Sequence, residues 1–478
     1  MRNVSDTFYT EHESEDQSRG KSWRYRYYVL DTVILVMVVL SIKELSLTFG
    51  RQSQLSSSIA STPFFTVDAL RPKTTILTRT KEPSAMGRRR FGLKRIIARS
   101  SSSNNEGPLA ADSSYDMVVV GGGSAGLTAA KFASGTLKKS VLIVEEERLG
   151  GDCTWTGCVP SKSLLAQAKA SKMARNYAIQ HLSGSGNSND SDAEAHRSKS
   201  RSNFSTVQDY FRTVQESIYE EDDSPRALQE FGIETVEGQK AQLVSPTMLT
   251  YENGASTKTV EAKEGILLCT GAKPNRSSLI EGLSDIDYLT YEEIWTRDFG
   301  GSLPQKWTVV GGGPIGCELA QALSRLGASV TIITGSSGRL LPSVDDAEVS
   351  EMMKEVFEED ENIKVVQGTL SRVEAVGDGS AGKPSNHIAH VETTTGKESV
   401  TVEGEAMLLS IGRKPNTAGL GLETLGIELD PQTGGIAVDK TLKTTVDGIY
   451  AAGDCTGDRQ FTHYAGTLHK IQRLSVFI

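Results

Sequence analysis

Two stretches of the chain share one order of apolar and turn-forming residues. In each, an apolar run leads into a glycine-rich turn, a helix-forming segment follows, and a second apolar run comes next. The first runs are residues 115–120 and 307–310, and the second runs are residues 140–144 and 329–334. Short apolar runs bounded by glycine turns predict strands. The pattern therefore predicts two βαβ units in an α/β protein.

Both turns have the spacing G-x-G-x-x-G. The glycines are Gly121, Gly123 and Gly126 in the first unit and Gly311, Gly313 and Gly316 in the second. The first glycine permits a tight turn, the second lets the backbone approach a pyrophosphate, and the third lets the helix pack on the strand. Ser124 and Ala125 complete the first motif, and the pyrophosphate would sit at the positive end of the following helix. Two such units predict two bound dinucleotides.

The residue that ends the second strand differs between the units. Glu145 ends it in the first unit, where a carboxylate can bind the ribose hydroxyls of a dinucleotide. Thr334 ends it in the second unit, and a loop containing Arg339 follows. Without a carboxylate, the contact that favours NAD is missing, and serine or arginine could hold the 2′-phosphate of NADPH. The second unit therefore favours NADPH over NADH, although Arg339 is equally well explained as a solvated loop residue.

A pair of cysteines directly follows the first unit. Cys153 and Cys158 are separated by four residues, and the sequence after Cys158 predicts a helix with proline near its start. The positive end of that helix would stabilise a thiolate, which is the reactive form of cysteine. The pair is predicted to close a redox-active disulfide. Two structural thiols or a weak metal pair are the alternatives, but no nearby histidine or cysteine completes a metal site, so no metal is predicted.

Composition excludes several classes of protein. The 478 residues suffice for two or three domains, and the net charge of −9 gives no reason to expect nucleic acid binding. The five cysteines have neither zinc-type spacing nor the density of a secreted disulfide scaffold. Cys269, Cys317 and Cys455 lie in apolar or motif segments and are predicted to be buried packing residues.

The N-terminal part has the composition of a targeting segment. Residues 29–42 form an apolar run, which is shorter than the ~20 residues of a membrane span and fits a signal sequence better. Residues 51–105 hold eleven lysines and arginines but only two acids. A signal followed by a transit-like stretch predicts import into a plastid. Mitochondrial import, a membrane anchor at residues 29–42, and a disordered tail from a wrongly chosen start codon are the alternatives.

Residues 150–162 resemble the active-site signature of the class I pyridine nucleotide-disulfide oxidoreductases. Residues 268–274 and 410–417 are similar to that family's crossings between two domains, and residues 448–454 to its late FAD motif. The resemblance implies that the first unit binds FAD and the second NAD(P)H. It implies an α/β fold with two Rossmann-like domains, the NAD(P) domain inserted into the FAD domain.

The resemblance also implies roles for individual residues. Hydride passes from NADPH to the flavin, the reduced flavin opens the disulfide through Cys158, and Cys153 then attacks the substrate. Lys162 is expected near the flavin, paired with Glu318, with a solvated surface lysine as the alternative. Further residues implied to bind the cofactors are Gly151, Lys162, Thr270, Gly271, Gly412 and Asp454.

These features divide the chain into expected segments. They are a targeting or disordered segment 1–114, an FAD domain 115–300 with a disordered polar insert 183–203, an NAD(P) domain 301–405, a return to the FAD domain 406–466, and a short tail 467–478. In the family, a C-terminal domain forms the homodimer interface and supplies a His–Glu dyad. Beyond Asp454 this sequence has only His463 and His469, neither followed by glutamate, so we expect that the sequence is truncated.

The predicted function is FAD-dependent reduction of a small-molecule or protein disulfide, or of a metal or thiol substrate, by NAD(P)H in cell redox homeostasis. Residues 151–158 and 461–465 look closer to mercuric-reductase-like proteins than to glutathione reductase. A dihydrolipoamide dehydrogenase, a quinone-reducing flavoprotein and a non-catalytic flavin-binding subunit are the alternatives.

Overall fold

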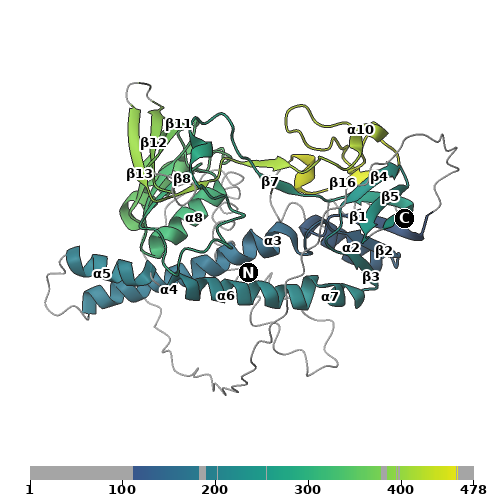
Figure 1. Ribbon diagram of the computed structural model, residues 1–478, viewed down its shortest axis with the longest axis horizontal. Coiled ribbons are helices and arrows are strands. Elements are labelled where there is room, and N and C mark those ends of the chain that lie inside the picture. The colour runs from purple at the N-terminus through teal and green to yellow at the C-terminus, as the bar shows by residue number, and fades with distance from the viewer. Residues whose placement is uncertain are drawn as a thin grey trace, which may run out of the picture. The chain divides into compact units, whose positions relative to one another are not determined.

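The computed structural model describes residues 111–181, 190–201, 203–254, 256–377, 385–394, 396, 399–458 and 460 (Figure 1). The predicted targeting features at 29–42 and 51–105 lie outside the described residues, as do His463, His469 and the tail. Of the helices in the described part, none combines the length and apolarity that crossing a bilayer requires.

A first sheet is built around the first predicted strand. Its strands are β1 (Ser113–Val120), β2 (Val141–Val144), β3 (Ile233–Val236), β4 (Ala241–Ser245), β5 (Met248–Asn253), β6 (Ser256–Leu268) and β16 (Ile449–Ala451), in the order β3-β2-β1-β6-β5-β4 with β16 also on β6. β1, β2, β3, β6 and β16 run parallel, and Val118 is in register with Leu142 and Ile266. Val118 and Val119 point to opposite faces of the sheet and are both 0% exposed, so the apolar run of β1 reflects a strand covered on both faces.

A second, smaller parallel sheet contains the second predicted unit. Its order is β10 (Ile363–Val366), β9 (Ser329–Ile333), β8 (Lys306–Val310) and β14 (Ala406–Leu409). A separate antiparallel sheet of β11 (Gly368–Ala375), β12 (His387–Thr393) and β13 (Ser399–Gly404) follows β10 in the chain. Both nucleotide units predicted from the apolar pattern are therefore present.

The second sheet is inserted into the first. Between β6 and β16 of the first sheet, the chain makes the whole second sheet and passes through β7 (Ala272–Pro274) and β15 (Arg413–Pro415). β7 and β15 pair antiparallel, so the outgoing and returning crossings lie side by side. This confirms the predicted α/β fold of two Rossmann-like domains. Because β14 pairs with β8, the second sheet extends to Leu409, a few residues beyond the expected boundary at 405.

Helices cover both sheets and connect them. They are α2 (Ser124–Gly135), α3 (Gly151–Trp155), α4 (Cys158–His181), α5 (Asp190–Arg201), α6 (Phe204–Ile218), α7 (Pro225–Gln229), α8 (Pro314–Arg325), α9 (Ala347–Glu355) and α10 (Leu422–Leu425), the 3-10 turns η2 (Leu283–Asp285) and η4 (Asp454–Thr456), and the π-turns η1 (Tyr219–Asp223) and η3 (Val356–Asp360). The long helix α4 packs against both α6 and α8, and Figure 1 shows α4 and α6 running side by side. α4 thus links the cysteine pair of the first domain to the helix of the second nucleotide unit.

The polar segment 183–203 was expected to be disordered, and this is wrong for residues 190–201, which form α5. Arg201, only 8% exposed, donates from Nη1 to the carbonyl of Gly327 at 2.7 Å, just beyond α8. Arg175 of α4 likewise donates to the carbonyl of Arg325 at 3.0 Å. Cations are favoured at the C-terminus of a helix, where carbonyls lack partners. Composition alone could not reveal this docking; residues 182–189 lie outside the described part.

Candidate active site

The first glycine turn has no room for side chains at two of its three motif positions. Gly121 has φ +105°, and a Cβ there would lie 2.3 Å from the carbonyl oxygen of Cys269. A Cβ on Gly126 would lie 2.0 Å from the carbonyl oxygen of Gly121. A Cβ on Gly123 would meet only Gly151 Cα, at 3.8 Å. Strand, turn and helix therefore pack closely while the middle glycine stays accessible, which fits the approach of a pyrophosphate at the start of α2.

Glu145 lies against this turn, as the sequence predicted. Its carboxylate accepts hydrogen bonds from the backbone N–H groups of Gly122 at 2.6 Å and Glu147 at 2.8 Å. Burial raises the pKa of Glu145, and the two backbone donors act in the opposite direction. The acid is therefore fixed at the edge of the turn, where a ribose hydroxyl could be bound.

The second glycine turn repeats this geometry. Gly311 has φ +111°, and a Cβ there would lie 2.3 Å from the carbonyl oxygen of Ser410. A Cβ on Gly316 would lie 2.1 Å from Gly311 O, whereas a Cβ on Gly313 would meet nothing within 4 Å. The residues present therefore fit a second dinucleotide.

The loop after β9 lies against the second turn. Thr334 is only 4% exposed, and its hydroxyl accepts from the backbone N–H of Gly368 at 3.3 Å. Arg339 donates from Nη2 to the carbonyl of Val344 at 3.2 Å, so it is not simply solvated. Its Nε is buried and has no hydrogen-bond partner among the described residues. A buried donor without a partner costs free energy.

The cysteine pair is docked onto the first turn. Cys158 is the first residue of α4, as predicted, whereas Cys153 lies within the short helix α3, which the sequence did not predict; both cysteines are half-buried. Gly151 has φ +56°, and a Cβ there would lie 2.7 Å from Gly123 Cα. Residues 151–158, which hold both cysteines and are called the redox loop below, are therefore in backbone contact with the first dinucleotide turn. The start of α4 places positive helix-end charge at Cys158, which favours its thiolate.

Lys162 and Glu318 form the ion pair that the family resemblance implied. Lys162 Nζ lies 2.6 Å from Glu318 Oε1, with side chains 24% and 22% exposed. The hydroxyl of Ser161 also donates to Glu318 Oε1 at 3.2 Å. The alternative of a solvated surface lysine is therefore wrong. Because Lys162 is on α4 and Glu318 on α8, the pair connects α4, the redox helix that begins at Cys158, to the second nucleotide unit.

The two crossing motifs meet beside the first turn. A Cβ on Gly121 would lie 3.1 Å from Thr270 N, so Thr270 borders the turn. The hydroxyl of Thr270 donates to the carbonyl of Asn416 at 2.6 Å, and Asn416 N donates to the carbonyl of Gly271 at 2.9 Å. Gly412 has φ +101°, and its carbonyl accepts a hydrogen bond from the backbone N–H of Asn275, next to the first crossing, at 2.9 Å.

Arg413 is the most connected residue of the site, and sequence reasoning missed it. Its two terminal nitrogens form ion pairs with Asp152, the residue before Cys153, and with Asp454, the predicted FAD residue. Its Nε donates to the hydroxyl of Tyr291 at 2.9 Å. Burial raises the pKa of Asp454, and Arg413 acts in the opposite direction. The signals were present, since Arg413 lies in the second crossing motif, but nothing local indicated the partners.

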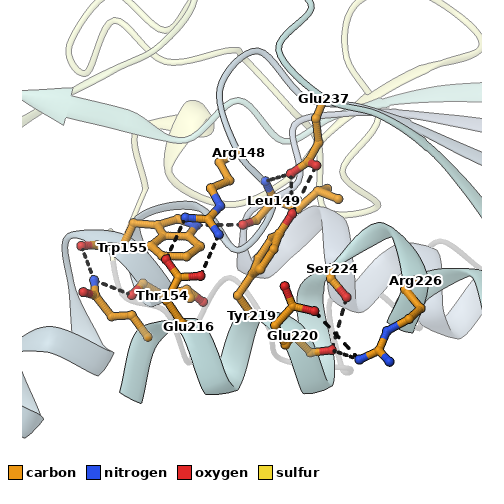
Figure 2. A network of polar contacts seen from close by, with 11 residues as sticks. Arg148, Leu149, Thr154, Trp155, Glu216, Tyr219, Glu220, Ser224, Arg226 and Glu237 are labelled. Atoms are coloured by element: carbon orange, nitrogen blue, oxygen red, sulfur yellow. Dashed lines mark hydrogen bonds and ion pairs between the residues drawn. The ribbon is translucent and has the colours of Figure 1, made fainter. Parts of the chain in front are cut away.

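A network of polar and aromatic side chains contacts Trp155, at the end of α3 (Figure 2). The guanidinium carbon of Arg148 lies 3.7 Å from the ring centroid of Trp155 and 4.1 Å from that of Tyr219. Arg148 also donates two hydrogen bonds to Glu216, at 2.9 and 3.2 Å. Trp155 Nε1 donates to the carbonyl of Leu149 at 2.8 Å. Cation–π contacts and hydrogen bonds therefore join the end of α3 to α6 and η1.

The remaining cysteines are packing residues, as predicted. Burial raises the pKa of Cys317 to about 12 and that of Cys455 to about 11, and it raises the pKa of Cys269 as well. These thiols stay protonated near neutral pH and are poor nucleophiles. Within the described ranges, no cluster of three or more His, Cys, Asp or Glu side chains is placed to hold a metal ion.

Two dinucleotide folds, with a cysteine pair docked on the first and ion-paired through its helix to the second, define a nucleotide-dependent disulfide oxidoreductase architecture. The chain belongs to the pyridine nucleotide-disulphide oxidoreductase family, which it matches over residues 115–469.

Relatives within this family carry two different names. Mercuric reductase from Bacillus cereus is 32% identical over 354 residues, which are 73% of this chain and 50% of that protein. Dihydrolipoyl dehydrogenase from Bacillus subtilis is 28% identical, covering 73% of this chain and 69% of that protein. This chain thus spans only half the length of the first relative.

A solved structure has the same fold. The HOCl-induced flavoprotein disulfide reductase RclA from Escherichia coli matches with a TM-score of 0.58 at 22% identity, covering 75% of this chain and 69% of that one.

Proposed function

We propose that the protein is an FAD-dependent NAD(P)H:disulfide oxidoreductase. One observation carries the proposal: α3 and α4 hold the cysteine pair against the first dinucleotide turn, and Lys162 of α4 is paired with Glu318 of the second unit. The thiol pair therefore lies against the first dinucleotide turn and is joined through α4 to the second unit, which supports electron transfer between nucleotides and disulfide.

The chain offers residues to hold both dinucleotides. FAD would be held by the turn from Gly121 to Gly126, by Glu145 and by Asp454, and it would supply two-electron transfer between nicotinamide and thiols. NAD(P)H would be held by the turn from Gly311 to Gly316. The Lys162–Glu318 pair keeps a lysine ammonium, and so positive charge, partly buried between the two units.

The thiol chemistry follows from the positions of the cysteines. In the reduced protein, the Cys153 thiolate attacks one sulfur of a substrate disulfide, forms a mixed disulfide and releases the other half as a thiolate. Cys158, held as thiolate at the start of α4, then attacks Cys153 Sγ. This step reforms the Cys153–Cys158 disulfide and releases the second half of the substrate, and both released thiolates take protons from water.

The substrate class is a small-molecule or protein disulfide, in a role in cell redox homeostasis. The mercuric reductase relatives make a mercury–thiol complex the second substrate to test, and the dihydrolipoyl dehydrogenase relatives make dihydrolipoamide the third. Steady-state assays with these three substrates distinguish them.

NADPH is the favoured donor. Thr334 supplies no carboxylate to bind a 2′-hydroxyl, and the loop that carries Arg339 lies against the second glycine turn, where a Cβ on Gly312 would lie 3.0 Å from the carbonyl oxygen of Arg339. If this is right, Arg339→Ala raises KM for NADPH far more than KM for NADH. Equal effects on both would remove Arg339 from the 2′-phosphate site.

Homodimerisation and import into a plastid complete the proposal. Homodimerisation is supported by family membership and is tested by light scattering of the purified protein. Plastid import is supported by the apolar run 29–42 and the basic stretch 51–105, and a fluorescent protein fused after residue 110 tests it in cells. Fluorescence in mitochondria or at a membrane would contradict plastid import and favour mitochondrial import or a membrane anchor.

The central experiment is anaerobic titration of the purified protein with NADPH. We expect a bound flavin that is reduced and two new thiols per chain, mapped to Cys153 and Cys158. Cys153→Ser and Cys158→Ser should each abolish disulfide reduction but spare reduction of a dye. Absence of flavin, or flavin reduction without new thiols at these positions, would refute the enzyme proposal; the latter favours a quinone-reducing or flavin-binding role.

A further inference from the structure

The backbone between the two cysteines is held by side chains that come from distant parts of the chain. Gln215 Nε2 of α6 donates to the carbonyls of Thr154 and Trp155, at 3.0 and 2.7 Å. Trp295 Nε1 donates to the next carbonyl, that of Thr156, at 2.8 Å. Three consecutive carbonyls between Cys153 and Cys158 therefore each accept a hydrogen bond from a side chain.

These donors are buried and bind carbonyls at the end of a short helix, α3. Gln215 is 5% exposed and Trp295 is 3% exposed. α3 has only five residues, and the last carbonyls of any helix lack partners within the helix. Without Gln215 and Trp295, these carbonyls would be left without partners or the loop would open to water.

The side chains of the same loop are also fixed. The hydroxyl of Thr154 donates to Asp223 Oδ2 at 2.8 Å, in a fully buried contact. The hydroxyl of Thr156 donates to Asp152 Oδ1 at 3.1 Å. A Cβ on Gly157 would lie 2.7 Å from the carbonyl oxygen of Asp152, so the loop turns back on its own start.

We propose that Gln215 and Trp295 are positioning residues that set the reduction potential of the Cys153–Cys158 couple. This inference rests on the proposed function, because it assumes that the two cysteines form the redox disulfide. A loop fixed in one conformation raises the effective concentration of one sulfur at the other, as a linker of matched length does for two binding sites. The disulfide is thereby favoured over the dithiol, and the potential becomes more negative.

The equilibrium with dithiothreitol measures this effect directly. In that exchange, the protein disulfide gains two electrons and two protons to become two thiols, and dithiothreitol loses them to become its cyclic disulfide. Replacing Gln215 with leucine removes both donated hydrogen bonds at similar volume, and Trp295→Phe removes the indole donor while keeping an aromatic ring. Each variant should shift the equilibrium toward the dithiol by up to about fivefold, the value reached when the net worth of a hydrogen bond is lost from the disulfide form alone. At about 30 mV per tenfold for two electrons, this is about 20 mV less negative.

Matched controls exist in the same molecule. Gln208 lies on the same helix, is 6% exposed, and donates to the carbonyl of Arg297 at 3.0 Å, not to a carbonyl between the two cysteines. Trp307 is 1% exposed and donates to the carbonyl of Pro304 at 3.1 Å. Gln208→Leu and Trp307→Phe should lower thermal stability as the test variants do but leave the potential unchanged. If Gln215→Leu does not fold, Gln215→Met replaces it.

The experiment separates this inference from the proposed function. Peptide mapping of the oxidised wild-type protein first establishes the Cys153–Cys158 disulfide, and its absence would refute the proposed function. With the disulfide present, a wild-type potential in both test variants would overturn the positioning role. The same holds if the control variants shift the potential equally, because the effect would then come from general loss of stability.

Discussion

Glu361 connects the redox helix to the second nucleotide unit, and its replacement should be costly. Its carboxylate, with a side chain 4% exposed, accepts hydrogen bonds from Arg325 Nε of α8 at 2.9 and 3.1 Å and from Lys172 Nζ of α4 at 3.0 Å. Glu361→Gln keeps the shape but leaves two cations facing a neutral amide. Breaking a buried ion pair by removing one partner costs about 3–5 kcal/mol. Because Lys172 and Arg325 remain 26% and 20% exposed, water relieves part of this, and we expect a loss of about 2 kcal/mol.

The pH dependence gives this prediction its sharpest test. Although burial alone raises the pKa of Glu361, the contacts to Arg325 and Lys172 outweigh it and lower the pKa from the ordinary 4.5. The stabilisation is therefore complete above the unfolded-state pKa and is lost as the pH falls through the lower folded-state pKa. Urea unfolding should separate wild type and Glu361→Gln fully at pH 7 and less and less below pH 4.5. Glu358→Gln, at an exposed position of η3, the π-turn that directly precedes Glu361, is the control and should match wild type. A difference that does not change between pH 7 and the acid limit would refute the ion-pair explanation.

Three further predictions follow from the sites. Gly126→Ala should abolish flavin binding, because its Cβ would lie 2.0 Å from the backbone oxygen of Gly121; stoichiometric flavin in the purified variant would contradict this. Lys162→Met should retain flavin but slow its reduction by NADPH about tenfold or more, because the partly buried positive charge is lost. Stopped flow measures this rate, and an unchanged rate would show that Lys162 has no role in hydride transfer. Burial lowers the pKa of His387 below its ordinary 6.5, and Nε2 of its ring lies 3.0 Å from the hydroxyl oxygen of Thr308. The unfolded state therefore binds the proton more readily than the folded state. The free energy of unfolding should fall as the pH drops through 6.5. His387→Gln should flatten that slope in thermal melts between pH 7 and pH 5.5, and an equal slope in both proteins would rule His387 out.

Local signals in the sequence were sufficient to predict the nucleotide units. The glycine spacing and the flanking apolar runs act within a few residues, so the turns at Gly121 and Gly311 and the position of Glu145 could be predicted directly. The position of Cys158 at a helix start was predictable for the same reason. The pairing of Lys162 with Glu318 joins two domains, and only the family resemblance suggested it.

The remainder of the site depends on contacts between segments far apart in the chain. Arg413 joins Asp152 to Asp454, and Gln215 and Trp295 reach the redox loop from two other segments. No periodicity or spacing encodes such meetings, because they are produced by the packing of helices and crossings. The helix α5 was missed for a related reason: a polar composition suggests disorder, whereas its stability comes from docking on another helix.

The inserted topology also fixes an order of events during synthesis. β1 and β2 leave the ribosome early, but β16, which completes their sheet, is made only after the whole second sheet. Arg413 and Asp454 are likewise late, so the redox loop is translated long before the residue that ties it to the late motif exists. Domains generally fold as units during synthesis, N-terminal first, but here the first sheet cannot be completed until the whole second sheet has been translated. A nascent chain therefore holds Cys153 and Cys158 for much of its translation before the ion pairs of Arg413 with Asp152 and Asp454 can form.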